Sequence, residues 1–383
     1  MNAKEIAEIR RRVRRDRSNI TAIYGCYVNA QKEIISEFKQ STGIMPENEA
    51  EKYFALLKRT LSGSIGKNLI DITFKTSQVA DSQEHKLLMD LRSSCLSDQQ
   101  ARENLYRKII DNVSFQDNYL ILLGCDNYDV PFKSKDDETQ ADASGETFTY
   151  VLCAVCPVKQ TKPNLHYVSD EKEFHDGGIA YVVAAPETGF MFPAFDNRAT
   201  NIYNALFYTH SPKENHQALV EALFHVEPPM CAQDQKKSFE ALLSTSLQDS
   251  CSMEVVQNVH GQICQCIELH KEAKVAEPLL ISKEQVKQAL TMSGVPEANV
   301  AKFSVDYDSA FGFEAQLHPK NIINDKRFEI SMPDISIKVS PEKADLIETR
   351  VIGGVKYILI CADEDVEVNG VRINIGQEEP ATV

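Results

Sequence analysis

The chain opens with a helical pattern of hydrophobic and polar positions. Ile6, Ile9 and Val13 recur at helical spacing, and arginines cover the other faces, so an amphipathic helix is predicted over residues 3–15. Further helices are predicted near residues 46–61, 78–93, 98–112, 233–248 and 252–273. Strand-like runs rich in β-branched and aromatic residues occur at 19–28, 68–74, 119–125, 146–156, 165–168, 179–185 and 200–209. Short strands without regular strand–helix alternation indicate an antiparallel or mixed sheet.

A different pattern begins after a short linker at residues 274–279. Ser282 starts a capping box, Pro296 opens a second helix, and period-two alternation follows from Ile335. Gly353-Gly354 and Asn369-Gly370 are typical of two-residue hairpin turns. The C-terminal region is therefore predicted to hold two helices followed by a small antiparallel meander.

These patterns predict an α+β protein whose N-terminal body has a mixed or antiparallel sheet with flanking helices. A small C-terminal α+β domain follows it. The predicted parts are a body over 1–275, including a basic helix at 1–17 and a helical segment at 210–273, a C-terminal domain over 279–376, and a tail over 377–383.

Charge restricts the classes of partner. The formal net charge of −15 disfavours nucleic acid or an anionic membrane as a partner of the whole surface. Residues 1–17 are the exception, with seven basic and three acidic side chains. Either this helix binds a polyanion, or its apolar stripe packs on the body and its arginines are solvated or paired. The candidate polyanion-binding residues are Arg10, Arg11, Arg12, Arg14 and Arg15.

Ten cysteines are scattered without the dense spacing of a secreted disulfide framework. The first residues contain no apolar core typical of a signal peptide, and no apolar run reaches the length of about 20 residues that a membrane helix needs. We therefore expect a cytoplasmic protein with reduced thiols and no membrane partner.

Three motifs resemble catalytic or metal sites but fail a check of their spacing. Gly66-Lys67 lacks the first glycine and the hydroxyl residue of a phosphate loop, and a turn after a helix explains it. Cys153 and Cys156, three apart on a strand, should point to opposite faces. The pairs His260/Cys264 and Cys266/His270 point in different directions from one helix and cannot enclose a single metal ion. No metal site and no cofactor are predicted.

Acidic residues that follow a buried strand are a further candidate. Asp126 and Asp129 come after residues 119–125, where loop carboxylates can bind metals or act as bases. Solvated loop acids are the commoner outcome, and this is the outcome we expect.

The segment from Gly189 to Tyr203 is the strongest candidate for a ligand site. Aromatic residues crowd a predicted loop and lead directly into polar ones, a combination that small-molecule pockets use. In the competing interpretation the aromatics fill the core while Asp196 and Arg198 form a structural ion pair. The candidate ligand-binding residues are Phe192, Phe195, Asp196, Arg198, Asn201 and Tyr203.

Several segments spread over the chain resemble one uncharacterised bacterial family. They are residues 4–12, 67–71, 156–159, 192–196, 200–206, 348–352 and 355–360, which read KEIAEIRRR, KNLID, CPVK, FPAFD, TNIYNAL, ETRVI and VKYILI. By these segments the whole chain resembles domain of unknown function family 4317. The resemblance implies no activity, cofactor or catalytic residue.

Three function hypotheses follow from these observations. The first is a binding or regulatory protein without catalysis, with a protein partner as one possibility. The second is an enzyme acting on a small molecule or phosphate ester in a pocket near Asp196 and Arg198, in which the arginine would position an anion and a carboxylate would act as base. The third is polyanion binding through the N-terminal arginines.

Overall fold

A computed structural model describes residues 1–133, 139–275, 277–362 and 366–373. Contacts divide the chain into two compact units, of which unit 1 is Met1–Asp234 with Ala276–Pro278 and unit 2 is Gln235–Val275 with Leu279–Val383. The protein is α+β, as the sequence predicted. The division by contacts falls before the helices at 233–273, whereas the predicted linker lies after them.

Unit 1 is built on one antiparallel sheet with the strand order β2-β1-β4-β5-β9-β12-β3, and β8 pairs with β5. Its strands are β1 (Ala22–Val28), β2 (Ile34–Ser41), β3 (Leu69–Thr73), β4 (Asn118–Lys133), β5 (Thr139–Gln160), β8 (Tyr181–Val183), β9 (Thr188–Phe192) and β12 (Asn204–Thr209). Smaller antiparallel pairs are β6 (Leu165–Val168) with β7 (Glu173–Asp176), and β10 (Ala194–Asp196) with β11 (Ala199–Asn201).

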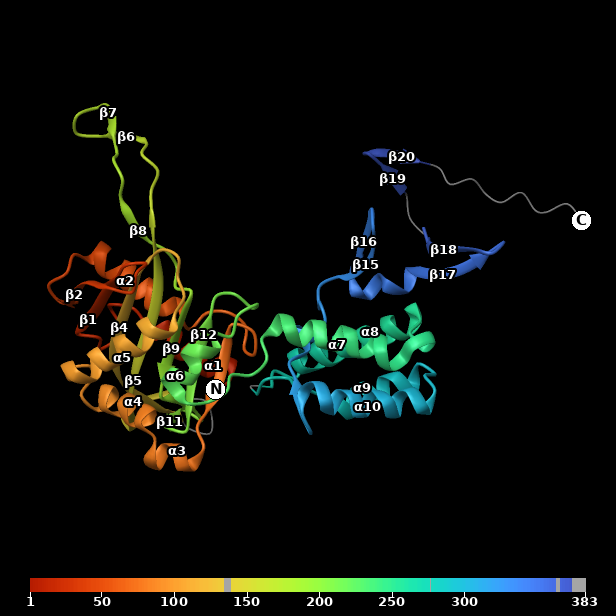
Figure 1. Ribbon diagram of the computed structural model, residues 1–383, viewed down its shortest axis with the longest axis horizontal. Helices are drawn as coiled ribbons and strands as arrows, with labels where there is room; N and C mark the ends of the chain where they lie inside the picture. The colour runs from red at the N-terminus through yellow and green to blue at the C-terminus, as the bar shows by residue number, and fades with distance from the viewer. Residues whose placement is uncertain (134–138, 276, 363–365, 374–383) are drawn as a thin grey trace, which may run out of the picture. The chain divides into compact units, whose positions relative to one another are not determined.

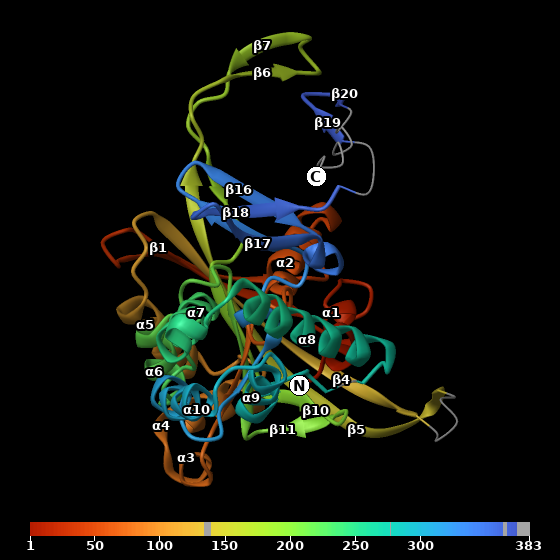
Figure 2. The same cartoon turned by 90° about the vertical axis from the view of Figure 1, so that its right-hand side faces the viewer.

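Helices cover both faces of this sheet, and each face has its own hydrophobic core (Figure 2). Along β4, Ile121 and Leu123 face one core, while Leu120 and Leu122 face the other, because side chains alternate on a strand. The first core lies under α4 (Gln83–Ser93), α5 (Gln99–Asn112) and α6 (Gln217–Phe224); α1 (Ala3–Arg12) and α2 (Glu47–Arg59) cover the second, and the short α3 is Thr76–Asp81.

Two predictions about the cysteines can be compared with the structure: the opposite orientation of Cys153 and Cys156, and the absence of disulfides. Cys153 and Cys156 are both buried but belong to different cores, so they lie on opposite faces as predicted. Cys95 and Cys125 form a disulfide, with Cα atoms 5.5 Å apart. The expectation that all thiols are free is therefore wrong for this pair, because the turn after α4 brings Cys95 beside β4.

Unit 2 has a helical core made of four helices. Phe239 of α7 and Val259 of α8 share this core with Leu290 of α9 and Phe303 of α10. These elements are α7 (Ala232–Leu247), α8 (Met253–Glu272), α9 (Lys283–Met292) and α10 (Glu297–Phe311), with β13 (Ile281–Ser282), β14 (Gln316–Leu317) and α11 (Pro319–Ile322). The two predicted C-terminal helices thus pack with two helices that the sequence had assigned to the body.

The C-terminal strands of unit 2 form separate hairpins. The pairs are β15 (Phe328–Met332) with β16 (Ile335–Val339), β17 (Ile347–Ile352) with β18 (Val355–Ile360), and β19 (Val366–Val368) with β20 (Val371–Ile373). Gly353-Gly354 and Asn369-Gly370 have positive φ angles at their turns, as the sequence predicted. Among the described residues these hairpins do not join into one sheet, so the predicted meander is wrong.

Candidate functional site

The first helix is fixed on unit 1 by its cap and by its apolar side. Asn2 accepts hydrogen bonds from the amides of Lys4 and Glu5, and the Glu5 carboxylate accepts one from the amide of Asn2. This is a capping box, which satisfies the free amides of the first turn. Ile6, Ile9 and Val13 are buried in the core of the second sheet face. The helix therefore presents its remaining sides, including the arginines, along the surface of unit 1.

Arg12 is bound to a buried carboxylate. Its Nε lies 2.8 Å from an Asp126 oxygen, and Asp126 is 1% exposed. The same carboxylate accepts hydrogen bonds from the Tyr150 hydroxyl (2.9 Å) and the Asn19 amide (2.6 Å). Burial, followed by the neighbouring Asp126 charge, raises the pKa of Tyr150 well above its usual value, so the hydroxyl donates as a neutral group.

The prediction that Asp126 is a solvated loop acid is wrong. The strand β4 continues to Lys133 and carries Asp126 into the protein interior, where Arg12 neutralises it. The carboxylate of Asp129 accepts a hydrogen bond from the Thr147 hydroxyl of the neighbouring strand at 2.9 Å.

Arg198 lies in the turn between β10 and β11. Asn197 and Arg198 have φ angles of 51° and 58°, the left-handed conformation of a tight hairpin turn. The guanidinium donates to the Glu8 carboxylate at 2.5 Å and to the Pro131 carbonyl at 2.9 Å. The Tyr128 hydroxyl also donates to Glu8, at 2.7 Å. These contacts hold the turn against the first helix.

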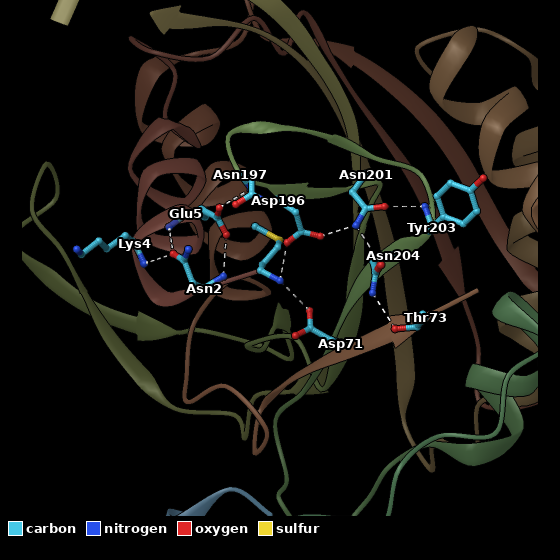
Figure 3. A network of polar contacts seen from close by, with 11 residues as sticks. Asn2, Lys4, Glu5, Asp71, Thr73, Asp196, Asn197, Asn201, Tyr203 and Asn204 are labelled. Atoms are coloured by element: carbon cyan, nitrogen blue, oxygen red, sulfur yellow. Dashed lines mark hydrogen bonds and ion pairs between the residues drawn. The ribbon is translucent and has the colours of Figure 1, made fainter. Parts of the chain in front are cut away.

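Asp196 has other partners, so it does not pair with Arg198 as the competing interpretation assumed. Its carboxylate lies 2.7 Å from the Met1 amine and accepts a hydrogen bond from the Asn201 amide at 2.6 Å (Figure 3). Asp71 lies 3.4 Å from the same amine. Burial lowers the pKa of the Met1 amine, but the carboxylates of Asp71 and Asp196 outweigh this effect and raise it.

The aromatic residues of the predicted site do not line one pocket. Phe192 and Phe195 are both fully buried, and they belong to opposite cores of unit 1. Tyr203 is 43% exposed, and its amide donates to Asn201. The structure thus places the six predicted ligand-binding residues in three separate groups. Phe192 and Phe195 are in the cores, Asp196, Asn201 and Tyr203 are linked by hydrogen bonds, and Arg198 contacts the first helix.

A pocket of about 810 Å³ lies beside the first helix and joins two of the predicted sites. Arg198 from the β10–β11 turn lines it together with Arg11 and Arg12, whereas Asp196, Arg10, Arg14 and Arg15 are not among the lining residues. The lining residues are Ala3, Lys4, Ala7, Glu8, Arg11, Arg12, Arg17, Tyr128, Pro131 and Arg198. We call this the basic pocket, because five of these side chains are cationic and one is anionic.

The charges of the basic pocket differ in how far they are neutralised. Arg12 is paired with Asp126, and Arg198 with Glu8. Lys4 and Arg11 take part in no side-chain ion pair within the described residues. The Arg12 guanidinium also lies over the Tyr128 ring, 4.4 Å from its centre. The pocket therefore carries excess positive charge, and Tyr128 is the aromatic residue in its lining.

Sequence reasoning named Arg11, Arg12 and Arg198 and missed the other seven lining residues, four of which have charged or aromatic side chains. Lys4 and Glu8 were detectable, because they lie one helical turn apart and Arg11 follows at the next turn. Arg17 belongs to the same basic segment. Tyr128 gave no signal, since only the fold brings β4 beside the first helix.

Other predicted motifs form no ligand site. The Nδ1 atom of His260 lies 3.6 Å from the Sγ atom of Cys264. Burial raises the pKa of the Cys264 thiol to about 11, so this thiol is a poor nucleophile. Within the described ranges, no three His, Cys, Asp or Glu side chains are grouped so that they could hold a metal ion. In the same ranges no helix combines the length and apolar character needed to cross a bilayer.

The fold and the pocket together define an α+β protein whose first helix and a hairpin turn enclose a basic pocket. The chain belongs to the family described as a domain of unknown function (DUF4317), whose profile matches residues 1–371. No curated protein and no solved structure matches the chain significantly.

Proposed function

We propose that this protein binds, without catalysis, a ligand that carries two or more phosphate groups, and that it does so in the basic pocket. The observation that supports this is that cations from two distant parts of the chain line one pocket: Lys4 and Arg11 of the first helix, which have no side-chain ion pair among the described residues, and Arg198 of the β10–β11 turn. Guanidinium groups present planar donor pairs that fit phosphate oxygens. Several cations around one space favour a multiply charged anion over a single carboxylate.

Binding is favoured over catalysis by the positions of the carboxylates. The enzyme hypothesis needed a carboxylate as base near Asp196 and Arg198, but Asp196 is engaged by the Met1 amine and Asn201. The carboxylate that lines the pocket is Glu8, which is occupied by Arg198 and Tyr128. The basic pocket therefore offers hydrogen-bond donors to an anion, while the carboxylates of Asp196 and Glu8 are held in structural contacts.

As part of this proposal we assign the protein to the bacterial cytoplasm. Cys95 and Cys125 form a disulfide, but the other eight cysteines carry free thiols, four of them buried, and burial raises the pKa values of Cys153 and Cys156, the latter to about 12. Thiols of this kind behave as small hydrophobic groups and suit a reducing compartment.

Calorimetric titration with inorganic tripolyphosphate tests the proposal. We expect binding that weakens as salt is raised from low to high concentration, because the contacts are charge–charge contacts near the surface. Arg11→Ala should lower the affinity about tenfold, since a hydrogen bond to a charged group contributes about 1.5–3 kcal/mol. Arg15→Ala is the matched control, because Arg15 is exposed on the same basic segment but lies outside the pocket.

Two results would contradict the proposal. The first is no heat of binding for tripolyphosphate at low salt. The second is an equal loss of affinity in Arg11→Ala and Arg15→Ala, which would indicate diffuse attraction to the basic segment without a defined pocket.

A further inference from the structure

A projecting arm of unit 1 has an apolar face that nothing covers among the described residues. The arm is residues 161–180, between β5 and β8, and its end is the β6–β7 hairpin (Figure 1). Tyr167 pairs with Phe174 across the hairpin, and on the same face Leu165 pairs with Asp176, which is charged. Tyr167, Phe174 and Leu165 are 51%, 67% and 72% exposed.

The opposite face of the hairpin is mostly polar. His166 pairs there with His175, and Val168, its one apolar side chain, pairs with Glu173. The hairpin is therefore amphipathic, a pattern that a strand pair has when one face is buried. A two-stranded hairpin that packs against nothing is marginally stable in water, so its apolar face is suited to an interface.

An apolar groove of about 450 Å³ lies at the base of the same arm. Its lining includes residues of β8, which directly follows the arm, and of β2, which is an edge strand of the large sheet. Ile35 of β2 is 52% exposed, and the outer edge of β2 has no strand partner among the described residues. The groove is lined by Tyr27, Ile35, Ser36, Phe38, Tyr53, Asn118, Leu120, Val158, Tyr181 and Val183.

We propose that two copies of this chain form a dimer in which the arm of each copy lies in the groove of the other. The arm has an apolar face and free strand edges, and the groove has apolar walls beside a free strand edge. The apolar face can therefore pack against the apolar walls while the two free strand edges form backbone hydrogen bonds with each other. Because the groove lies at the base of the arm, a two-fold axis lets both contacts form at once.

The area available supports two reciprocal contacts. Fully exposed aromatic side chains present roughly 150–250 Å², so the uncovered parts of Tyr167, Phe174 and Leu165 amount to on the order of 300 Å². Two arms and two grooves that each lose this area bury on the order of 1,200 Å² in total, the lower limit for a specific stable interface. One arm in one groove buries about half of that, which is the range of nonspecific contacts.

Sedimentation velocity of the full chain over a range of micromolar concentrations tests the dimer. The wild type should shift from one to two chains as concentration rises. Phe174→Asp on the arm and Ile35→Asp in the groove should each keep the protein monomeric at the highest concentration. His166→Ser changes the polar face of the same hairpin and should leave the dimer intact.

The variants alter exposed residues, so their thermal melts should match the wild type and exclude unfolding as the cause. A wild type that stays monomeric throughout would overturn the proposal. So would a dimer that persists in Phe174→Asp or in Ile35→Asp, since the arm and the groove are both required.

Discussion

Replacing Arg12 with alanine removes the partner of a buried charge. The Asp126 carboxylate has no exposed surface, and the Arg12 side chain is 16% exposed. Removing one partner of a buried ion pair lowers the free energy of unfolding by about 3–5 kcal/mol, because an uncompensated charge is left in the interior. The amide of Asn19 and the hydroxyl of Tyr150 continue to donate to Asp126, which places the expected loss near the lower limit, at about 3 kcal/mol.

Chemical denaturation followed by circular dichroism measures this loss, and a thermal melt checks it. In a domain of this size about 3 kcal/mol corresponds to a fall in Tm of roughly 6–12 °C. Arg11→Ala is the matched control, since Arg11 is the adjacent arginine and is exposed, and its effect should stay within about 0.5 kcal/mol.

A second substitution identifies the cause. Asp126→Asn removes the buried charge, so Arg12→Ala should cost less in the Asp126→Asn background than in the wild type. Equal stability of Arg12→Ala and Arg11→Ala would refute the reasoning, because Arg12 would then be a surface arginine whose contacts with Asp126 contribute nothing.

Four further predictions follow from the structure. Arg198→Gly should lower the affinity for tripolyphosphate about tenfold while the Tm stays near that of the wild type. Glycine adopts the left-handed backbone without strain, and this gain offsets the loss of the partly exposed ion pair with Glu8. A fall in Tm as large as that expected for Arg12→Ala would show that the role of Arg198 is structural. Burial lowers the pKa of His216, so its contribution to stability is present above about pH 6.5 and is lost as pH falls through the folded-state pKa. Thermal melts between pH 7.5 and 5 should therefore show a weaker pH dependence of Tm in His216→Asn than in the wild type. Asparagine is chosen because it tolerates the left-handed backbone at this position. Identical profiles of Tm against pH would exclude His216 as a cause of the pH dependence. Alkylation of protein unfolded without reductant should label eight of the ten cysteines, and labelling of all ten would show that Cys95 and Cys125 are not joined. Limited proteolysis should yield a stable fragment that begins near residue 235, because α7 and α8 share a core with α9 and α10; a stable fragment that begins near 279 would instead favour the domain boundary predicted from the linker.

Local patterns were sufficient to predict much of the fold. The buried stripe of Ile6, Ile9 and Val13, the alternation of Cys153 and Cys156, and the hairpin turns after Ile352 and Val368 all depend on residues within a few positions of one another. Periodicity and turn chemistry act over that range, so the sequence alone contains the information.

The errors concern contacts between distant parts of the chain. Glu8 and Arg198 lie 190 residues apart, and nothing near Arg198 in the sequence indicates that its partner is on the first helix instead of at Asp196. Phe192 and Phe195 resembled the walls of a pocket, but Phe192 on β9 and Phe195 on β10 are buried in opposite cores of unit 1. Asp126 was assigned to a loop because acidic residues usually end a strand, and Arg12 permits the strand to continue.

The turn at Asn197 and Arg198 has a consequence for comparing members of this family. Asparagine followed by glycine is the sequence that a tight hairpin turn accepts most easily, whereas an arginine with positive φ costs on the order of 1 kcal/mol in backbone strain. Because the ion pair of Arg198 with Glu8 offsets this strain, stability alone leaves arginine and glycine nearly equal at position 198. The residue at this position therefore sorts family members by the proposed function: those with arginine should bind polyphosphate, and those with glycine should bind it more weakly.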